Sequence, residues 1–273
     1  MAEGDTVHAT AERLHDALAG HVLTRSDVRI PRFATTDLSG RLVHAVVARG
    51  KHLLVRTDGD VSVHSHLGMD GSWRIYRHGE RWHGPSIEIR CVLQTEDRIA
   101  VARRLRRLEI VRTSAEDRIL GHLGPDVLGP DWDQAEATKR LVADPERAVG
   151  EALIDQTVMA GPGNVYRSEV CFLAGIDPRA PVRDVPDAEA LVGAMKQLME
   201  RNRGGGRRVT TDDPRRGHEL WVYGRGGRPC RRCGTPIRSF LQGGDERIVY
   251  LCPSCQAGDR ASYPKGRDQR SSM

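Results

Sequence analysis

The sequence contains no run of 18 apolar residues, which excludes a transmembrane helix of ordinary length. Its opening stretch, MAEGDTVHATAERL, is acidic and polar where a secretory signal is apolar, so export by that route is not expected. Aromatic residues make up only 4% of the 273 residues, whereas hydrophobic residues make up 38%. This balance suits one or two globular domains with a sizeable core.

Lysine is nearly absent, since the 42 basic residues include only four lysines: Lys51, Lys139, Lys196 and Lys265. Arginine supplies the rest, and it binds phosphate through a planar, bidentate fork. The net charge of +5 permits an acidic partner such as nucleic acid without requiring one. Because arginine is so strongly preferred in this chain, we expect that a retained lysine such as Lys51 is needed for its amine.

Six cysteines are present, and two of them lie singly in apolar runs typical of a core: Cys91 and Cys171. The other four form two CxxC pairs separated by eighteen residues: Cys230, Cys233, Cys252 and Cys255. With no export signal, this spacing favours metal binding over disulfides. Four sulfurs on a predicted β-hairpin form a closed tetrahedral set, so we expect one structural Zn²⁺ ion.

The first half of the chain predicts a helix followed by strands. Residues 5–19 have apolar side chains at helical spacing, and six short period-two runs follow within about seventy residues. The runs are HLLVRT, VSVHSHL, SWRIYR, SIEIRCVL, RIAVAR and LEIVR. Strands this short and closely spaced favour an antiparallel sandwich or barrel over a parallel α/β sheet.

The second half predicts helices, after a Gly/Pro-rich boundary at 121–132. The expected helices span 132–142, 147–158, a segment ending at Phe172, and 187–202. The fold class is therefore α+β and multi-domain. We expect four segments, which are a β-sandwich with its leading helix at 1–120, a helical domain at 121–217, a zinc finger at 218–257 and a disordered tail at 258–273.

A sharp turn at Gly161-Pro162-Gly163 precedes one of these helices. Asn164 follows it, where it either caps the helix or helps to bind a phosphate at the helix N-terminus. Arg167 comes one turn later on the same face, which favours the phosphate interpretation.

Five motifs then occur in order: an opening xEG, RGKHL near residue 50, HLGMDG, DQ followed by GxGNxYRxE, and CxxC…CxxC. In this combination the chain, over residues 2–256, resembles the formamidopyrimidine-DNA glycosylase / endonuclease VIII family of base-excision-repair enzymes. The resemblance implies a β-sandwich, a helix–two-turns–helix domain with a zinc finger, and duplex DNA bound in the cleft between them. It also implies a monomer acting on a flipped-out nucleotide at a damaged or abasic site, in the bacterial cytoplasm with the nucleoid.

The resemblance assigns catalysis to Ala2, Glu3 and Lys51. In the family an N-terminal proline amine attacks C1′ of the damaged nucleotide, the adjacent glutamate moves protons, and the lysine stabilises charge. Here Ala2 replaces that proline, so removal of Met1 gives a primary amine, with a pKa of about 7.7–8.0 in the free state. Thr6 is a second departure, since endonuclease VIII proteins often carry a glutamate there.

The resemblance also assigns DNA contacts. Met69 matches an intercalating residue that fills the hole left by the flipped base. Arg103 and Leu105 match the loop facing the orphaned base, and Asn164 and Arg247 match a phosphate-gripping pair.

Three functions follow from these observations. The first is a bifunctional DNA glycosylase and AP lyase acting on oxidised bases, with the opening EGD and the compact 203–217 loop favouring oxidised pyrimidines. The second is a family member impaired by Ala2 that only binds damaged or abasic DNA. The third, a zinc-ribbon module of a transcription or translation factor, uses residues 228–256 and leaves the other motifs unexplained.

Overall fold

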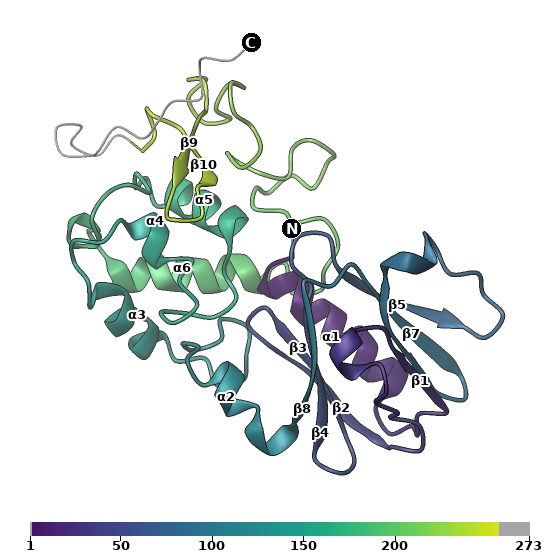
Figure 1. Ribbon diagram of the computed structural model, residues 1–273. Helices are drawn as coiled ribbons and strands as arrows, with labels where there is room; N and C mark the ends of the chain where they lie inside the picture. Colours follow the sequence, from purple (N-terminus) through teal and green to yellow (C-terminus); the bar gives the residue numbers. More distant parts are fainter. Residues whose placement is uncertain (1, 257–273) are drawn as a thin grey trace. The chain divides into compact units, whose positions relative to one another are not determined.

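The computed structural model describes residues 2–256 of the chain, and the predicted tail at 258–273 lies outside them. The chain forms two compact units whose boundary falls between His122 and Leu123 (Figure 1). No helix within the described residues is long and apolar enough to cross a membrane.

The N-terminal unit consists of helix α1 (Gly4–Leu18) and two four-stranded sheets whose strand pairs are all antiparallel. One sheet has the order β2-β3-β4-β8 and the other β1-β6-β7-β5. The strands are β1 Arg25–Val28, β2 Val43–Arg49, β3 His52–Thr57, β4 Val61–His66, β5 Ser72–Arg77, β6 Ile89–Gln94, β7 Arg98–Arg103 and β8 Arg107–Arg112. The short helices are η1 Pro31–Phe33, η2 Ser86–Glu88, η3 Thr113–Ala115 and α2 Asp117–Leu120.

One hydrophobic core joins the two sheets and α1. It contains Leu14 of α1, Val55 and Val63 of the first sheet, and Leu93 of the second. Figure 1 shows α1 between the β2, β3 and β8 strands of one sheet and the β1, β5 and β7 strands of the other. Burying each such side chain contributes about 1.5–3 kcal/mol, so the helix and sheets stabilise one another. The predicted antiparallel sandwich with a leading helix is confirmed.

All six predicted strand runs form strands, but the prediction omitted β1 and β2. The β1 sequence RSDV has a single apolar residue, Val28, and gains its place by pairing with β6. The run SIEIRCVL was assigned entirely to a strand, whereas its first three residues form the 3₁₀ helix Ser86–Glu88.

The C-terminal unit consists of helices and one two-stranded hairpin. Its elements are α3 Gln134–Val142, α4 Val149–Ala152, α5 Asn164–Leu173, η4 Val182–Asp184, α6 Ala188–Glu200, β9 Arg238–Gln242 and β10 Arg247–Leu251. Helix α3 packs on α6, and α5 contacts both α6 and β10. Figure 1 shows the β9–β10 hairpin beside α5. The mixed fold with a helical region and a cysteine-bearing hairpin is confirmed.

The predicted helix at 147–158 is wrong, because only Val149–Ala152 is α-helical. The carboxylate of Asp155 accepts hydrogen bonds from the backbone N–H and the hydroxyl of Thr157, at 2.9 and 2.7 Å. A short aspartate side chain that bonds the backbone two residues later favours a turn over a continuing helix. The segment therefore turns toward the Gly161–Gly163 loop.

Candidate active site and nucleic-acid interface

The N-terminal end of the chain is held against the turn that joins β4 and β5. The backbone nitrogen of Ala2 donates to the carbonyl oxygen of Gly68 at 3.3 Å. Glu3 is the N-cap residue of α1 and is fully buried. Because α1 begins at the next residue, the helix fixes where Ala2 and Glu3 lie.

Lys51 lies in the turn between β2 and β3, immediately before the first residue of β3. Burial, and next the positive charge of Lys51, lower the pKa of His66 to about 4. The Nδ1 atom of His66 accepts the N–H of Gly68 at 3.0 Å. Gly68 thus bonds His66 through its N–H and Ala2 through its carbonyl, so the β4–β5 turn connects the predicted nucleophile with the neighbourhood of Lys51.

This turn presents Met69 to solvent, with 67% of the residue exposed. The preceding Gly68 has a φ of +68°, and a Cβ there would lie 2.8 Å from Cβ of Arg106. Only glycine fits this left-handed, closely packed position. Met69 is therefore a surface residue on a turn that requires glycine at position 68, and it is not part of the core.

The other two predicted DNA contacts of this unit are buried. Arg103 ends β7, is 5% exposed, and its guanidinium donates to the carbonyl of Pro85 and to Glu88. Leu105 lies in the hydrophobic core. A contact of either side chain with a base requires it to leave these surroundings, so both roles remain predictions.

Two exposed arginines of the same loop were missed by the sequence reasoning: Arg104 and Arg106. Arg104 has a φ of +48° and pairs with Glu88, and the side chain of Arg106 covers Gly68. The sequence VARRLRR contained both, but nothing in its spacing distinguished the exposed arginines from the buried one.

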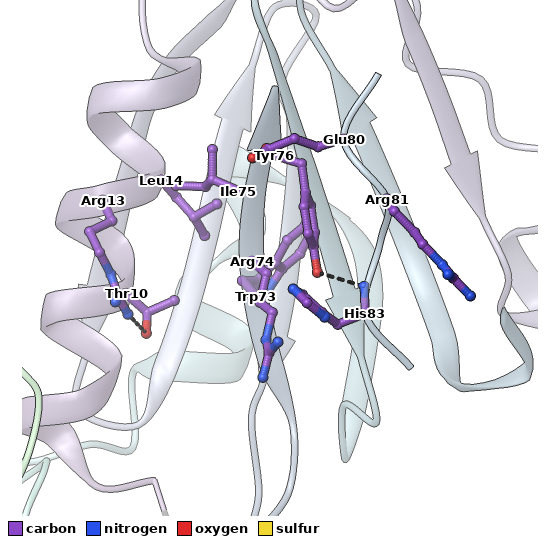
Figure 2. Close-up of a pocket in the computed structure, with 10 residues that line it drawn as sticks. All are labelled: Thr10, Arg13, Leu14, Trp73, Arg74, Ile75, Tyr76, Glu80, Arg81 and His83. Carbon is purple, nitrogen blue, oxygen red and sulfur yellow. Dashed lines mark hydrogen bonds between the residues drawn. The ribbon is translucent and has the colours of Figure 1, made fainter. Parts of the chain in front are cut away.

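A pocket of about 570 Å³ lies between α1 and β5 in the same unit (Figure 2). Its lining includes Arg13, which donates to the carbonyl of Ala9 and the hydroxyl of Thr10. The hydroxyl of Tyr76 accepts the backbone N–H of His83 at 3.3 Å. None of the predicted site residues lines this pocket.

In the C-terminal unit, Asn164 is the first residue of α5, and the structure excludes the first of its two expected roles, that of helix cap. Gly163 occupies the N-cap position, and no side chain caps the helix. The Nδ2 atom of Asn164 instead donates to the carbonyl of Ile248 at 2.6 Å, and its Oδ1 accepts from Nε of Arg167 at 3.0 Å. Arg167 is fully buried, so it orients Asn164 rather than facing a phosphate as expected.

Arg247 begins β10 and is thereby brought next to Asn164, which bonds the carbonyl of the following residue, Ile248. The guanidinium of Arg247 is 38% exposed and pairs with Asp245 at 2.8 Å. Such an exposed ion pair is worth about 0–1 kcal/mol, so it leaves Arg247 available to a stronger anion.

Gln156 braces the loop that leads into α5. Its Nε2 donates to the carbonyl of Pro162 and its Oε1 accepts the N–H of Gly161, both at 3.0 Å. Because both ends of one amide are used, the side chain fixes the loop without capping the helix. The backbone N–H groups of the first turn of α5 then point toward the end at which Asn164 lies.

Glu169 on α5 is a buried hydrogen-bond acceptor for the 221–223 backbone, and the sequence analysis did not identify it. It is fully buried, and its carboxylate accepts backbone N–H groups at 2.8–2.9 Å from Trp221, Val222 and Tyr223. The hydroxyl of Thr210 donates to it as well. The motif YRxE contained this residue, and its multiple partners were visible only in the folded chain.

The four paired cysteines come together as predicted, and all six cysteines are free of disulfides. Their sulfur atoms lie within 4.8 Å of one another. Cys230 and Cys255 are 3.9 Å apart, and Cys233 and Cys252 are 3.4 Å apart. Tetrahedral zinc with Zn–S bonds of about 2.3 Å sets sulfurs about 3.8 Å apart, so this donor set fits a metal ion.

Comparison with known proteins places these two units in one family. Residues 1–111 match the formamidopyrimidine-DNA glycosylase N-terminal domain, and residues 123–211 match the formamidopyrimidine-DNA glycosylase H2TH domain. The chain belongs to the formamidopyrimidine-DNA glycosylase family. Membership makes it a DNA-repair enzyme of the glycosylase and AP-lyase class.

Two curated relatives of this glycosylase family are similar over nearly their whole length. A probable endonuclease 8 2 of Streptomyces coelicolor is 56% identical, covering 98% of each chain. The DNA-(apurinic or apyrimidinic site) lyase Nei2 of Mycolicibacterium smegmatis is 49% identical, covering 94% of this chain and 99% of the relative.

The fold is also found in a Lactococcus lactis formamidopyrimidine-DNA glycosylase bound non-covalently to DNA containing an AP site. That structure has a TM-score of 0.79 at 23% identity, and the match covers 94% of this chain and 100% of the other. The predicted resemblance and fold are therefore confirmed, whereas the residue assignments remain predictions.

Proposed function

We propose that this chain is a bifunctional DNA glycosylase and AP lyase that removes oxidised pyrimidines from duplex DNA through the α-amine of Ala2. The observation that carries the proposal is the hydrogen bond from the Ala2 nitrogen to Gly68, beside the buried Glu3. It holds the backbone nitrogen of Ala2, which becomes the terminal amine when Met1 is removed, next to an exposed turn in the unit that also holds Lys51.

The amine of Ala2 forms after removal of Met1. Its lone pair attacks C1′ of an everted deoxyribose, and the bond from C1′ to the damaged base breaks with the electron pair leaving on the base. Glu3 protonates the ring oxygen as the sugar opens, which yields an imine between Ala2 and C1′. Loss of a C2′ proton then expels the 3′ phosphate, and hydrolysis of the imine restores the amine.

A primary amine accounts for the chemistry but weakens it relative to proline. The imine formed by Ala2 needs a proton to become an electron sink, whereas a secondary amine gives a permanently charged iminium. Lys51 supplies a positive charge beside the turn, which favours the neutral amine and stabilises developing negative charge. We therefore propose an active enzyme that is slower than its Ala2→Pro variant.

The proposed DNA contacts divide between the two units. Met69 is the residue that fills the gap left by the flipped nucleotide, since it is exposed on the β4–β5 turn. Asn164 and Arg247 hold a phosphate at the N-terminal end of α5. One duplex needs one such set of contacts, so we propose that the enzyme acts as a monomer with the chromosomal DNA in the bacterial cytoplasm.

We propose that the metal held by the four cysteines is a single Zn²⁺ ion. Four thiolates fill a tetrahedral zinc site and leave no position for water, so the ion stabilises the hairpin and takes no part in the reaction. An ion bound there would fix the end of β10, the strand on which Arg247 lies.

The preference for pyrimidines rests on the opening EGD, on the compact 203–217 loop, and on the similarity to proteins named endonuclease 8. A panel of duplexes with one oxidised pyrimidine or one oxidised purine, each cleaved under single-turnover conditions, tests it. Faster release of the pyrimidine supports the proposal, and faster release of the purine overturns it.

The activity itself is tested by borohydride reduction on a duplex containing an abasic site. The expected result is a covalent protein–DNA band, with an intact mass that shows the loss of Met1. Tight binding to the abasic duplex without a band favours the alternative of a non-catalytic damage-binding protein. Retained Met1 in a preparation that still forms the band excludes Ala2 as the nucleophile.

A further inference from the structure

Three histidines and one glutamate lie together on one face of the β2-β3-β4-β8 sheet: His52, His64, His66 and Glu109. None of them takes part in the proposed reaction. The register pairs His52 with His66, and His64 with Glu109. These residues lie on the face opposite Leu53 and other core residues, because side chains alternate along each strand. His64 is fully buried.

Hydrogen-bond contacts connect three members of this group in the order Glu109, His64, His52. His64 Nδ1 lies 3.4 Å from a carboxylate oxygen of Glu109, and His64 Nε2 lies 2.8 Å from His52 Nδ1. The two rings are stacked, with centroids 5.1 Å apart. The edge-to-face contact between His52 and His66, at 5.4 Å, extends the group to the third ring.

This arrangement determines the tautomer of each ring. A carboxylate only accepts, so the hydrogen of His64 is on Nδ1, and its Nε2 then accepts the hydrogen on Nδ1 of His52. His66 Nδ1 accepts the N–H of Gly68, so its hydrogen is on Nε2. All three tautomer assignments assume neutral rings, in which only one of the two ring nitrogens carries a hydrogen.

The surroundings of all three rings lower their pKa, which favours the neutral form. Burial, and then the neighbouring His64, lower the pKa of His52 to about 3, and burial and Lys51 lower the pKa of His66 to about 4. Burial also lowers the pKa of His64, although Glu109 acts in the opposite direction. Arg107 pairs with Glu109 at 3.2 Å and adds positive charge beside the rings.

Through Gly68, this group is connected to the nitrogen of Ala2, the proposed nucleophile. His66 holds the N–H of Gly68, and the carbonyl of Gly68 accepts from the nitrogen of Ala2. Glu109 is therefore connected to Ala2 through three imidazole rings and one backbone residue. In chains of polar groups of this kind, the outer partners set the orientation of the inner ones.

We propose that Glu109, His64 and His52 are positioning residues that orient His66 and hold the β4–β5 turn where it places the terminal amine. They act through Gly68 and touch neither the substrate nor the reacting atoms. This inference rests on the proposed function, since it takes Ala2 to be the nucleophile.

The test compares two substitutions of one residue in the full-length protein. Glu109→Leu removes the acceptor that fixes His64, whereas Glu109→Gln retains an acceptor oxygen. At saturating abasic duplex, we expect the borohydride-trapping rate of Glu109→Leu to fall about tenfold, because small misplacements of reacting groups are costly. Glu109→Gln retains a rate within about twofold of the parent, and the Kd for duplex DNA is unchanged in both.

Glu96→Leu is the matched control, since Glu96 is an exposed acid of the same unit. An unchanged trapping rate in Glu109→Leu overturns the proposal. An equal loss of trapping rate in the Leu and Gln variants also overturns it. A fall in trapping rate, DNA affinity and melting temperature together overturns it as well, because it indicates that Glu109 only stabilises the fold.

A second measurement does not depend on catalysis. Imidazole ¹⁵N spectra of the parent protein are expected to show the Nδ1–H tautomer for His52 and His64 and the Nε2–H tautomer for His66. In Glu109→Leu, His64 and His52 lose their single tautomers. If the parent forms no covalent adduct but shows these tautomers, the proposed function fails while the hydrogen-bonded group stands, and different tautomers overturn the group itself.

Discussion

The two compact units hold their predicted functional residues by different means. In the N-terminal unit, Ala2 and Met69 are placed by the backbone, through the bond to Gly68 and the left-handed turn. In the C-terminal unit, Asn164 is placed by side chains, because Arg167 and the carbonyl of Ile248 take both ends of its amide. The first arrangement leaves Met69 exposed, whereas the second keeps Asn164 only 3% exposed within fixed contacts.

This difference predicts that substitutions in the two units affect different properties. Changes near the β4–β5 turn should alter the reaction while stability and DNA affinity remain. Changes in the buried polar contacts of α5 should alter stability and DNA affinity, with the reaction rate at saturating DNA less affected. A substitution that violates this division weakens the comparison.

The largest effect is expected for Glu3→Gln, which retains the shape of the buried side chain but cannot transfer a proton. General acid–base catalysis contributes about 10²–10⁴-fold, so base release should fall by at least about 10²-fold. Single-turnover cleavage of a lesion duplex measures it, with Glu12→Gln on the exposed side of α1 as control. A rate close to that of the parent protein contradicts the role of Glu3.

Glu169→Leu is the corresponding test in the C-terminal unit. It leaves the N–H groups of Trp221, Val222 and Tyr223 without their buried acceptor. Each unsatisfied buried donor costs about 1–3 kcal/mol, so we expect a loss of about 3 kcal/mol or more in the free energy of unfolding. Denaturant titration measures it, and Glu189→Leu on the surface of α6 is the control.

A stability loss below about 1 kcal/mol for Glu169→Leu indicates that the 221–223 backbone finds other partners. Unchanged stability together with a large loss of reaction rate is the more serious outcome. It places Glu169 in the chemistry and removes the distinction between the units.

Ala2→Pro tests the role of the terminal amine in the N-terminal unit. A secondary amine forms a permanently charged iminium, so we expect the trapping rate on abasic duplex to rise about tenfold, equivalent to about 1.4 kcal/mol. Ala2→Gly retains a primary amine and serves as control. Equal rates for all three proteins show that the α-amine is not the reacting group.

The smallest effects are expected at Arg247. Arg247→Ala removes one phosphate contact, so the slope of log K against log salt should fall in magnitude by about 0.9, with a several-fold loss of affinity at low salt. Asp245→Asn removes the competing carboxylate and should tighten DNA binding by less than about fivefold. Fluorescence anisotropy over a salt series measures both, and affinity that is unchanged in Arg247→Ala rejects the contact.

Sequence reasoning predicted the elements that local pattern determines. The strand runs, α1, α6 and the CxxC hairpin all follow from spacing within a few residues, and all are present. The 147–158 helix failed because Asp155 bonds the backbone of Thr157, a local competitor that the apolar spacing of the segment concealed.

The site was predictable in its residue types but not in its contacts. Motifs identified Ala2, Lys51 and Met69, yet Ala2 meets Gly68 only in the folded chain, and His52 meets His66 only because β3 pairs with β4. Likewise, nothing in the spacing of Arg167 distinguishes a buried arginine that orients Asn164 from an exposed one that binds phosphate. Burial is decided by the whole unit, so local sequence does not reveal it.

The account depends on which nitrogen bonds to the sugar, and this is measured by mapping the reduced adduct. After borohydride reduction on an abasic duplex, nuclease and protease digestion followed by tandem mass spectrometry locates the sugar remnant. We predict that it is attached to the α-nitrogen of Ala2 in a peptide lacking Met1. A remnant on the side chain of Lys51, or on any other residue, contradicts the account.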